Sequence, residues 1–305
     1  MIRSEVPALF SPIYDEFMLS TFNEESQIHP QIFQVIDDHT KEYKVDDLSG
    51  LGEWVDANEG EGGGYETPVL GYPKTFTQAK FWKKLQYSYE SVDQDEYFLL
   101  NKQGDAKQLG RGARALVEKK TAEVLADGFS TDGPDGVYLF HDQHPKSREE
   151  TAVYHDNLLS GAFSHDALED AEQQIAQNFF DMKGIPIDLI ENPLLVYPPE
   201  MRGAVKRVLD DRALEQPDTT LRNINQFAGR YKPVEWRYLS SSLAGTATNW
   251  FIVFPELGFL KIIWSARPHF SAWIDDDLEY YNFKGRMLCD VGATNWRCAF
   301  GCTGL

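Results

Sequence analysis

Apolar residues recur at helical spacing in three parts of the chain. Between Asp105 and Asp127 they return every three or four residues, which predicts a helix about 30–35 Å long that ends before Gly128. Residues 166–182 carry a second apolar stripe of the same period. A third stripe follows Pro198-Pro199, where proline is well tolerated because the first turn of a helix has unpaired backbone donors in any case.

Residues 81–89 show a different pattern, in which side chains alternate between two sides. Phe81, Leu85 and Tyr87 fall on one side, which predicts a β-strand. An acidic, glycine-rich tip at 58–66 separates this strand from an upstream limb, so residues 46–92 are predicted to form one long β-hairpin. Limbs of about 15 residues would extend roughly 50 Å, and such a ribbon is marginally stable alone in water. Its aromatic residues therefore need cover, for which another subunit is the obvious source.

The first 45 residues are predicted to form an arm rather than a domain. Pro7, Pro12 and Pro30 interrupt them and their apolar patches are short, so the arm must lie on another surface. Further strands are predicted at 192–197, 231–239, 250–254, 259–264, 269–274, 280–291 and 297–300. Helices and strands are thus segregated, which is typical of an α+β fold with antiparallel strands.

Composition narrows the class of protein. The chain has 305 residues, of which 42% are hydrophobic and 25% charged, as expected of a folded globular protein. No apolar run approaches the roughly 18 residues that span a bilayer, so no membrane partner is expected. The cysteines, Cys289, Cys298 and Cys302, are odd in number, which argues against a disulfide framework and predicts free, partly buried thiols.

Charge is strongly negative and unevenly distributed. The formal net charge of −19 repels phosphate backbones, so the chain is a poor candidate for a reader of duplex DNA sequence. Residues 1–70 carry 3 basic and 15 acidic side chains, whereas residues 71–120 carry 10 basic and 6 acidic ones. Opposite signs in adjacent segments suggest contact between them, within one chain or between copies. The alternative is two solvated faces that never meet.

Motifs with catalytic potential are weak. Residues 110–115 read GxGxxA, but no strand precedes them, as a dinucleotide site would require. Four histidines near acidic residues could ligate a metal, but without helical spacing they are interpreted as solvent-exposed loop residues; they are His141, His144, His155 and His165. Asp275-Asp276-Asp277 is interpreted as a solvated turn rather than a cation site. We therefore predict no catalytic residue, no metal site and no cofactor.

Three stretches carry a resemblance to a known family. Residues 109–113 (LGRGA) open the long helix, and residues 193–200 (PLLVYPPE) precede an Ala/Val-rich helix. Between them, Asp135-Gly136 leads to Phe140, followed by His144-Pro145 and Asn157-Leu158. In this order they resemble the major capsid proteins of tailed phages, which have the Hong Kong 97-type fold, and most closely the Mu-type head subunits. The resemblance covers residues 90–305, while the arm and hairpin match in character only.

The resemblance implies a division of the chain. It assigns 1–45 to an N-terminal arm, 46–92 to the extended loop, 93–183 to a peripheral domain with a spine helix, 184–258 to an axial domain, and 259–305 to return strands of the peripheral domain and a last axial strand. It also implies a function. Such subunits are not enzymes but assemble as pentamers and hexamers into an icosahedral shell around double-stranded DNA, in the virion capsid and, during assembly, in the host cytoplasm.

Partners follow from the same resemblance. DNA would be met without sequence-specific contact, and a net charge of −19 suits that role because a strongly basic wall would trap the genome. A portal and a decoration protein are expected. Because no long charged helical extension precedes the arm, a separate scaffolding protein is expected as well. The tip at 58–66 consists mainly of glycines and acids, so the lysine–asparagine crosslinking of one branch is not carried over.

The expected mechanism is binding between copies. Each hairpin would lie over the peripheral domain of a neighbour, and the acidic arm would contact a basic strip formed by Lys74, Lys80, Lys83, Lys84, Arg111, Arg114, Lys119 and Lys120. The predicted subunit-interface residues are Trp54, Phe76, Phe81, Trp82, Lys83, Lys84, Arg111 and Arg114.

Three alternatives stay open. The first is an encapsulin-type nanocompartment that stores an enzyme cargo, although encapsulins carry a short N-terminal helix where this chain has a proline-broken arm. The second is a metal-dependent hydrolase that uses the histidines between His141 and His165. The third is an oligomer that forms no shell.

Overall fold

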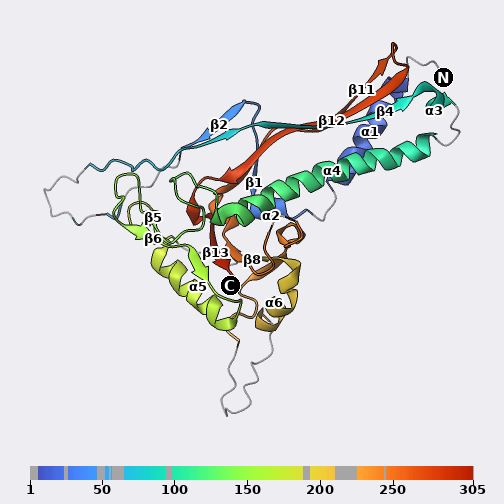
Figure 1. Cartoon of the computed structure of the whole chain (residues 1–305). Coiled ribbons are helices and arrows are strands. Elements are labelled where there is room, and N and C mark those ends of the chain that lie inside the picture. The colour runs from blue at the N-terminus through green and yellow to red at the C-terminus, as the bar shows by residue number, and fades with distance from the viewer. Residues whose placement is uncertain are drawn as a thin grey trace.

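A long, twisted sheet runs into a second, smaller sheet in the computed structural model of the chain (Figure 1). The structure describes residues 6–23, 27–46, 52–54, 56, 65–93, 98–187, 193–209, 225–243 and 245–304. None of the described helices is both long and apolar enough to cross a bilayer.

The long sheet has four strands in the order β1-β11-β12-β4. β11 (Leu260–Asp275) and β12 (Tyr280–Ala293) are antiparallel neighbours, β1 (Gln34–Asp37) runs parallel to β11, and β4 (Ala79–Ser88) pairs antiparallel with β12 at the edge. β11 continues through the two segments predicted at 259–264 and 269–274, which are joined by register shifts.

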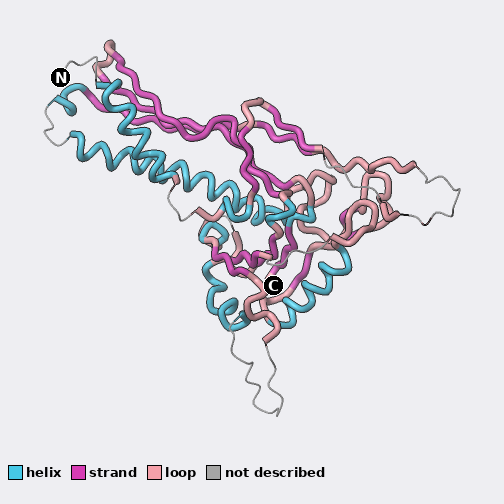
Figure 2. Tube along the Cα trace, turned by 180° about the vertical axis from the view of Figure 1, so that it is seen from behind, coloured by secondary structure: helices cyan, strands magenta, loops and turns pink. Residues whose placement is uncertain are grey.

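Helices cover one face of this sheet. α4 (Phe98–Ala126) lies along it, with α1 (Val6–Phe22) packed beside α4 and β11, as both views show (Figures 1 and 2). The inward residues of the strands alternate as an amphipathic strand requires. They form a buried cluster with the helices that includes Met18, Leu109, Phe270, Tyr281 and Phe283.

The smaller sheet has five strands in the order β7-β13-β10-β8-β9. Their bounds are Leu158–Ser160, Ala299–Thr303, Trp250–Val253, Leu194–Tyr197 and Lys232–Glu235. Every residue of β8 and β10 is buried, as expected of central strands that read as continuous apolar runs. α5 (His165–Asn178), capped by the Ser164 hydroxyl, and α6 (Arg202–Leu209) flank this sheet (Figure 1).

Short elements complete the described chain. The helical ones are α2 (His29–Ile32), α3 (Tyr89–Asp93), η2 (Asp127–Phe129), η3 (Pro199–Met201), η4 (Arg237–Leu239), η5 (Pro255–Leu257) and η6 (Trp296–Cys298). The paired strands are β2 (Glu42–Val45) with β3 (Lys74–Thr77), and β5 (His144–Pro145) with β6 (Tyr154–His155).

The predicted α+β class and long helix are confirmed, but the predicted long hairpin is wrong. The strand predicted at 81–89 exists as β4, yet ten of its residues pair with β12 instead of an upstream limb. Among the described residues, pairing between the two limbs is limited to the four residues of β2 and the four of β3. The apolar side of β4 gains its cover from the helices and strands of its own chain. Most of the predicted tip, residues 58–64, lies outside the described residues.

The N-terminal residues depend on another surface, and in the structure that surface belongs to the same chain. α1 continues through Pro12 rather than being broken there, and buries Met18 and Phe22. Behind it, the buried Glu118 of α4 accepts hydrogen bonds from the backbone of Ile28 (2.8 Å), from the His29 ring (2.8 Å) and from the Trp236 indole (2.9 Å). One carboxylate thus joins the N-terminal segment, the long helix and the segment after β9.

The three cysteines are free and buried. Burial raises the pKa of each thiol to about 12, so the thiols of Cys289, Cys298 and Cys302 stay protonated at neutral pH.

The GxGxxA motif lies inside α4 and serves packing. A Cβ atom at Gly110 would lie 2.4 Å from the carbonyl oxygen of Met18, so glycine there lets α1 approach α4 closely. Gly112, one half-turn away, has no neighbouring atom within 4 Å of a Cβ position.

These two glycines allow a matched test of the α1–α4 contact. We expect Gly110→Ala to lower the free energy of unfolding by about 1–3 kcal/mol, because the added methyl group forces the helices apart. Gly112→Ala should raise it by up to about 1 kcal/mol, since alanine favours helix and meets open space. Denaturant unfolding of the subunit measures both. Equal effects of the two substitutions would contradict the close contact.

Candidate functional site

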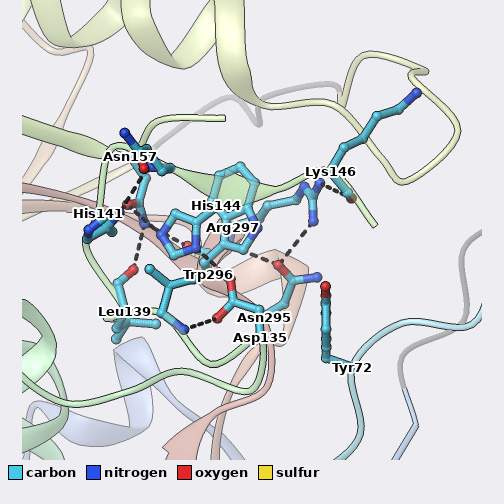
Figure 3. Close-up of polar contacts among 12 residues, drawn as sticks. Tyr72, Asp135, Leu139, His141, His144, Lys146, Asn157, Asn295, Trp296 and Arg297 are labelled. Carbon is cyan, nitrogen blue, oxygen red and sulfur yellow. Dashed lines mark hydrogen bonds and ion pairs between the residues drawn. The ribbon is translucent and has the colours of Figure 1, made fainter. Parts of the chain in front are cut away.

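Asp135, His144 and Asn157, all from the middle stretch that carries the family resemblance, meet in one buried hydrogen-bonded group (Figure 3). The His144 ring lies 2.7 Å from the Asp135 carboxylate through Nδ1 and 3.1 Å from the Asn157 side-chain oxygen through Nε2. The Asn157 amide nitrogen donates to the carbonyls of Leu139, Trp296 and Ala299, which fixes the orientation of the amide. Both ring nitrogens of His144 therefore face side-chain oxygens, one of Asp135 and one of Asn157.

Aromatic and cationic side chains close this group from one side. The Trp296 ring stacks on His144 with centroids 4.7 Å apart, and the Arg297 guanidinium lies 4.3 Å from the Trp296 centroid. Arg297 is itself buried and donates to the carbonyl oxygens of Phe180 (2.6 Å) and Lys146 (3.4 Å). The entrance to β13, the loop after α5 and the loops around β5 and β6 are thereby joined in one junction.

The expectation of solvent-exposed histidines is wrong for His144 and His155. Both are buried, because β13 and the residues before it cover loops that a linear pattern shows only as polar. His155 lies against the rings of Phe180 and Trp296, and its Nε2 has no hydrogen-bond partner among the described residues. Among all the residues that the structure describes, no group of three or more His, Cys, Asp or Glu side chains is arranged to hold a metal ion.

The segment between β2 and β3 is fastened to this junction at its base. The Tyr72 hydroxyl donates to the carbonyl of Ser147 (3.4 Å), and Glu66 pairs with Lys183 (2.6 Å) while accepting from the Gly52 amide (2.9 Å). Lys183 and the Gly52 amide hold the pKa of Glu66 below its ordinary value. The segment therefore projects past its own sheet toward β5 and β6 (Figure 1).

The projecting segment leaves large apolar side chains in solvent. Trp54 and Tyr65 are as exposed as in an extended peptide, and Leu70 is 57% exposed. Single exposed apolar residues are ordinary, but two fully exposed aromatic residues on one projection are typical of a contact surface.

A second exposed surface lies on the long sheet, on the side opposite α1 and α4. It consists of the exposed Lys80, Trp82, Lys84 and Trp273 and the half-buried Lys284 and Arg286, which we call the cation–aromatic face. The strand register places these side chains together, since Trp82 is opposite Arg286 and Lys84 is opposite Lys284. Ser271, the partner of Lys284 on β11, lies two residues from Trp273 on the same side.

Cations and indole rings are interleaved on this face. The Lys84 ammonium lies 5.2 Å from the Trp82 centroid and 5.5 Å from the Trp273 centroid, and the Lys284 ammonium lies 5.6 Å from Trp82. Two effects lower the pKa of Lys284. The larger is the partial removal of its ammonium group from water, and the smaller is repulsion from Lys80, Lys84 and Arg286. Cation–π contacts offset part of this repulsion.

The predicted interface residues differ in how far their side chains are exposed to solvent. Trp54, Trp82, Lys83, Lys84 and Arg111 are exposed and available for contact. Phe76 is not, because its ring is fully buried against Gly292 and Tyr43 of its own chain, so this prediction is corrected.

Two more of these residues are only half-buried. Phe81 packs against the main core, and Arg114 donates to the Thr21 carbonyl (3.4 Å) at the end of α1. Trp273, Lys284 and Arg286 are not among the predicted interface residues. Their strands are readable from alternation, but which strand lies beside β4 is not.

Residues 71–301 match a family model described as "Phage capsid protein". No curated protein matches the chain. Solved structures resemble it over nearly its whole length. A virus-like particle from Pyrococcus furiosus aligns with a TM-score of 0.55 at 10% identity, covering 96% of this chain and 99% of that one.

Two phage capsids resemble the chain to a similar degree. The mature capsid of bacteriophage PhiM1 gives a TM-score of 0.58 at 13% identity, covering 91% of this chain and 87% of that one. The capsid of cyanophage P-SCSP1u gives 0.59 at 10% identity, covering 92% and 88%. At such identities the likeness concerns the fold alone.

The buried His155 is expected to make the stability of the folded subunit depend on pH. Burial, and then the charge of Arg297, lowers the pKa of His155 to about 4, whereas an unfolded histidine titrates near about 6.5. The unfolded state therefore binds more protons, and stability is lost as the pH falls from about 6.5 toward 4, by up to about 3 kcal/mol. We expect His155→Phe to remove this part of the acid sensitivity, measured as unfolding midpoints between pH 7 and pH 4.5.

A histidine substitution elsewhere provides the control. His39 is exposed, and His39→Phe should leave the difference between the two pH values as in the unchanged protein. If His155→Phe and the unchanged protein lost stability equally on acidification, the neutral buried His155 would be refuted.

Proposed function

The chain belongs to the phage capsid protein family and is a shell-forming structural protein, and from this premise we propose that its copies assemble as pentamers and hexamers into an icosahedral shell around double-stranded DNA. The observation that carries the proposal is the family match over residues 71–301, on a fold of long sheet, long helix and smaller sheet. The role is binding between copies rather than turnover. His144, the centre of the most polar group described, is fully buried and so out of reach of a substrate.

The proposed division of the chain follows the sequence with one change. Residues 1–45 are the arm, 46–92 the extended loop, 93–183 the peripheral domain, 184–258 the axial domain and 259–305 the return strands with a last axial strand. We move α5 into the axial domain. Its Glu172 accepts from the Tyr231 hydroxyl (2.7 Å) and pairs with Arg230 (2.8 Å), just before β9. Both views place α5 beside α6 and the smaller sheet (Figures 1 and 2).

The proposed contact between copies uses the projecting segment. Trp54 and Tyr65 extend from a base that is held by Glu66 and Tyr72, so the aromatic side chains are presented rather than folded away. Burying them on a neighbour stabilises the contact at about 25 cal/mol per Å². Trp82, Lys83, Lys84 and Arg111 belong to the proposed interface set, while Phe76 is removed from it.

The partners beyond other copies are carried over from the family resemblance. We include a portal, a separate scaffolding protein and a decoration protein, together with DNA that is met without sequence reading. The subunit would assemble in the host cytoplasm and end in the virion. The net charge of −19 supports weak, non-specific contact with the genome, since phosphate is repelled from most of the surface.

An encapsulin-type nanocompartment is the second candidate within the same fold. The absence of an N-terminal helix no longer argues against it, because α1 is helical over Val6–Phe22. The likeness to the virus-like particle from Pyrococcus furiosus, at 10% identity, concerns the fold that both candidates share. The family match favours the phage capsid, and the nucleic-acid content of shells purified from an infected host distinguishes the two.

The projecting segment supplies the test of assembly. We expect the double substitution Trp54→Ala, Tyr65→Ala to leave the subunit folded, since both side chains are fully exposed, and to reduce the yield of shells at least about tenfold. Sedimentation and negative-stain microscopy measure the yield, and thermal unfolding checks the subunit.

The matched control retains the aromatic area. Trp54→Phe with Tyr65→Phe should assemble close to the normal yield, because most of the apolar surface remains. Normal shells from the alanine variant would remove the projecting segment from the assembly contact. Absence of shells from the unchanged protein would refute the function itself.

A further inference from the structure

A cavity lies between α4 and the inward face of the long sheet, close to the edge strand β4. Its volume is about 300 Å³, at the lower end of the range that is typical of small-molecule sites. Its walls come from α1, α4, β4, β11 and β12 of one subunit, and the apolar residues that line it include Met18, Phe81, Leu109, Leu116, Pro268 and Met287. An occupant must therefore enter between two packed layers rather than lie on an outer face.

Two glycines make room for this cavity. Gly285 lies on the inward side of β12, between the buried Phe283 and Met287, and Gly112 lines the cavity from α4. Neither has a left-handed backbone. A Cβ atom at Gly285 would have only the Met18 sulfur nearby, at 3.7 Å, and one at Gly112 would meet no neighbouring atom within 4 Å. Close packing and backbone conformation therefore explain neither glycine, in contrast to the glycine at the α1–α4 contact.

The position of Gly285 within a strand points to a ligand. Glycine inside a helix or a strand is less favourable than alanine, because it loses more backbone freedom on folding. In a strand it often marks a bulge, or a place where a ligand or another backbone approaches closely. Gly285 pairs regularly with Phe270 and Lys83, and no other backbone lies within 4 Å of its Cβ position. Of these reasons, a bound ligand is the one that remains.

The charges along the cavity indicate the kind of ligand. No acidic residue lines it. Lys83 lies opposite Gly285 on β4, and its exposed side chain has no ion-pair partner among the residues that the structure describes. Arg286 also lines the cavity, and within the same part of the chain its buried Nε atom has no hydrogen-bond partner. Apolar walls with cations and no acids favour an occupant that is apolar along most of its length and carries one anionic group.

We propose that this cavity binds an amphipathic carboxylate with an unbranched alkyl chain, such as a medium-chain fatty acid. The alkyl chain lies between α4 and the sheet, against Met18, Leu109 and Leu116, and the carboxylate lies beside Lys83 at the edge of the sheet. An extended alkyl chain is narrow enough to enter between packed layers, and burial of each methylene group is favourable. The inference goes beyond the proposed function, because binding is a property of the subunit whether or not shells form.

Chain length tests the apolar part of the site. The probes are hexanoate, octanoate, decanoate and dodecanoate, added to the delipidated full-length protein in a calorimetric titration. We expect the dissociation constant to fall about fourfold with each added methylene group, and to level off once the cavity is full. Decanol, which has the chain of decanoate without its charge, should bind at least about tenfold more weakly. A dissociation constant that did not depend on chain length would place the ligand outside an apolar cavity and overturn the inference.

Filling the cavity should prevent binding. Gly285→Val on β12 and Gly112→Leu on α4 each add a side chain to its wall, and we expect the affinity for decanoate to fall at least about tenfold in both. Two variants on different walls keep the test valid if one fails to fold, which circular dichroism reveals. Gly104→Leu is the matched control, because Gly104 lies on α4 with open space around its Cβ position but does not line the cavity.

Removal of the charge tests the anionic part of the site. Lys83→Met retains most of the length of the side chain, so we expect decanoate to bind about tenfold more weakly and decanol to bind as to the unchanged protein. Lys84→Met, on the opposite side of β4, should leave both affinities unchanged. Equal loss of affinity for decanoate and decanol in Lys83→Met would overturn the assignment of the carboxylate to Lys83.

Two results would overturn the inference as a whole. One is the absence of decanoate binding by the unchanged, folded protein. The other is unaltered binding in both folded variants with a filled cavity. If the unchanged protein bound no carboxylate and Gly285→Val reduced the yield of shells, the cavity would instead belong to a contact between copies.

Discussion

The contact between α4 and one face of the long sheet determines what the rest of the subunit can do. A four-stranded sheet has two faces, and α1 and α4 cover only one of them. The inward residues of β4, β12 and β11 are apolar and pack with Met18 and Leu109 of the helices. Because this face supplies the core, β4 can carry the exposed side chains of Lys80, Trp82 and Lys84 on the opposite face.

Two fastenings keep that arrangement rigid. Glu118 gathers donors from the N-terminal segment and from Trp236, so the long helix is tied both to the arm and to the smaller sheet. At the other end, Asp135, His144 and Asn157 tie the loops around β5 and β6 to the start of β13. Buried polar groups are expensive unless they are fully satisfied, and satisfied networks of this kind specify one geometry. The Tyr72 hydroxyl, which donates to the carbonyl of Ser147, connects the projecting segment to these loops.

Periodicity along the sequence predicts elements that depend on local spacing, but it does not predict contacts between distant segments. The long helix, β4 and the buried strand at 194–197 follow from spacing within a dozen residues. The partner of β4 does not, because β12 lies almost 200 residues away and nothing in either strand specifies the other. Pro12 suggested a broken arm, yet α1 continues through it where the ring is exposed and the helix is held by α4. Residues 135, 144 and 157 belong to the stretch that carries the resemblance, but the sequence does not predict the burial of His144 and Asn157, because polar loops are usually solvated.

A shell subunit must be stable alone and yet bind its copies only weakly at each contact. Burial of apolar surface mainly stabilises the single folded subunit, since the described apolar residues are concentrated in the core between helices and sheets. For the second purpose the chain offers exposed aromatic residues, Trp54 and Tyr65, and the compact cation–aromatic face. Contacts of this kind are individually weak and screened by salt, so an incorrectly placed copy can dissociate before neighbours hold it. Repetition of the same contact around a closed assembly then multiplies its effect, because each added copy meets several partners at high effective concentration. The same logic explains why the cations are placed on the long sheet rather than on a loop. A face held rigid by α4 presents its charges at fixed spacing, so that a neighbour loses little conformational entropy in matching them.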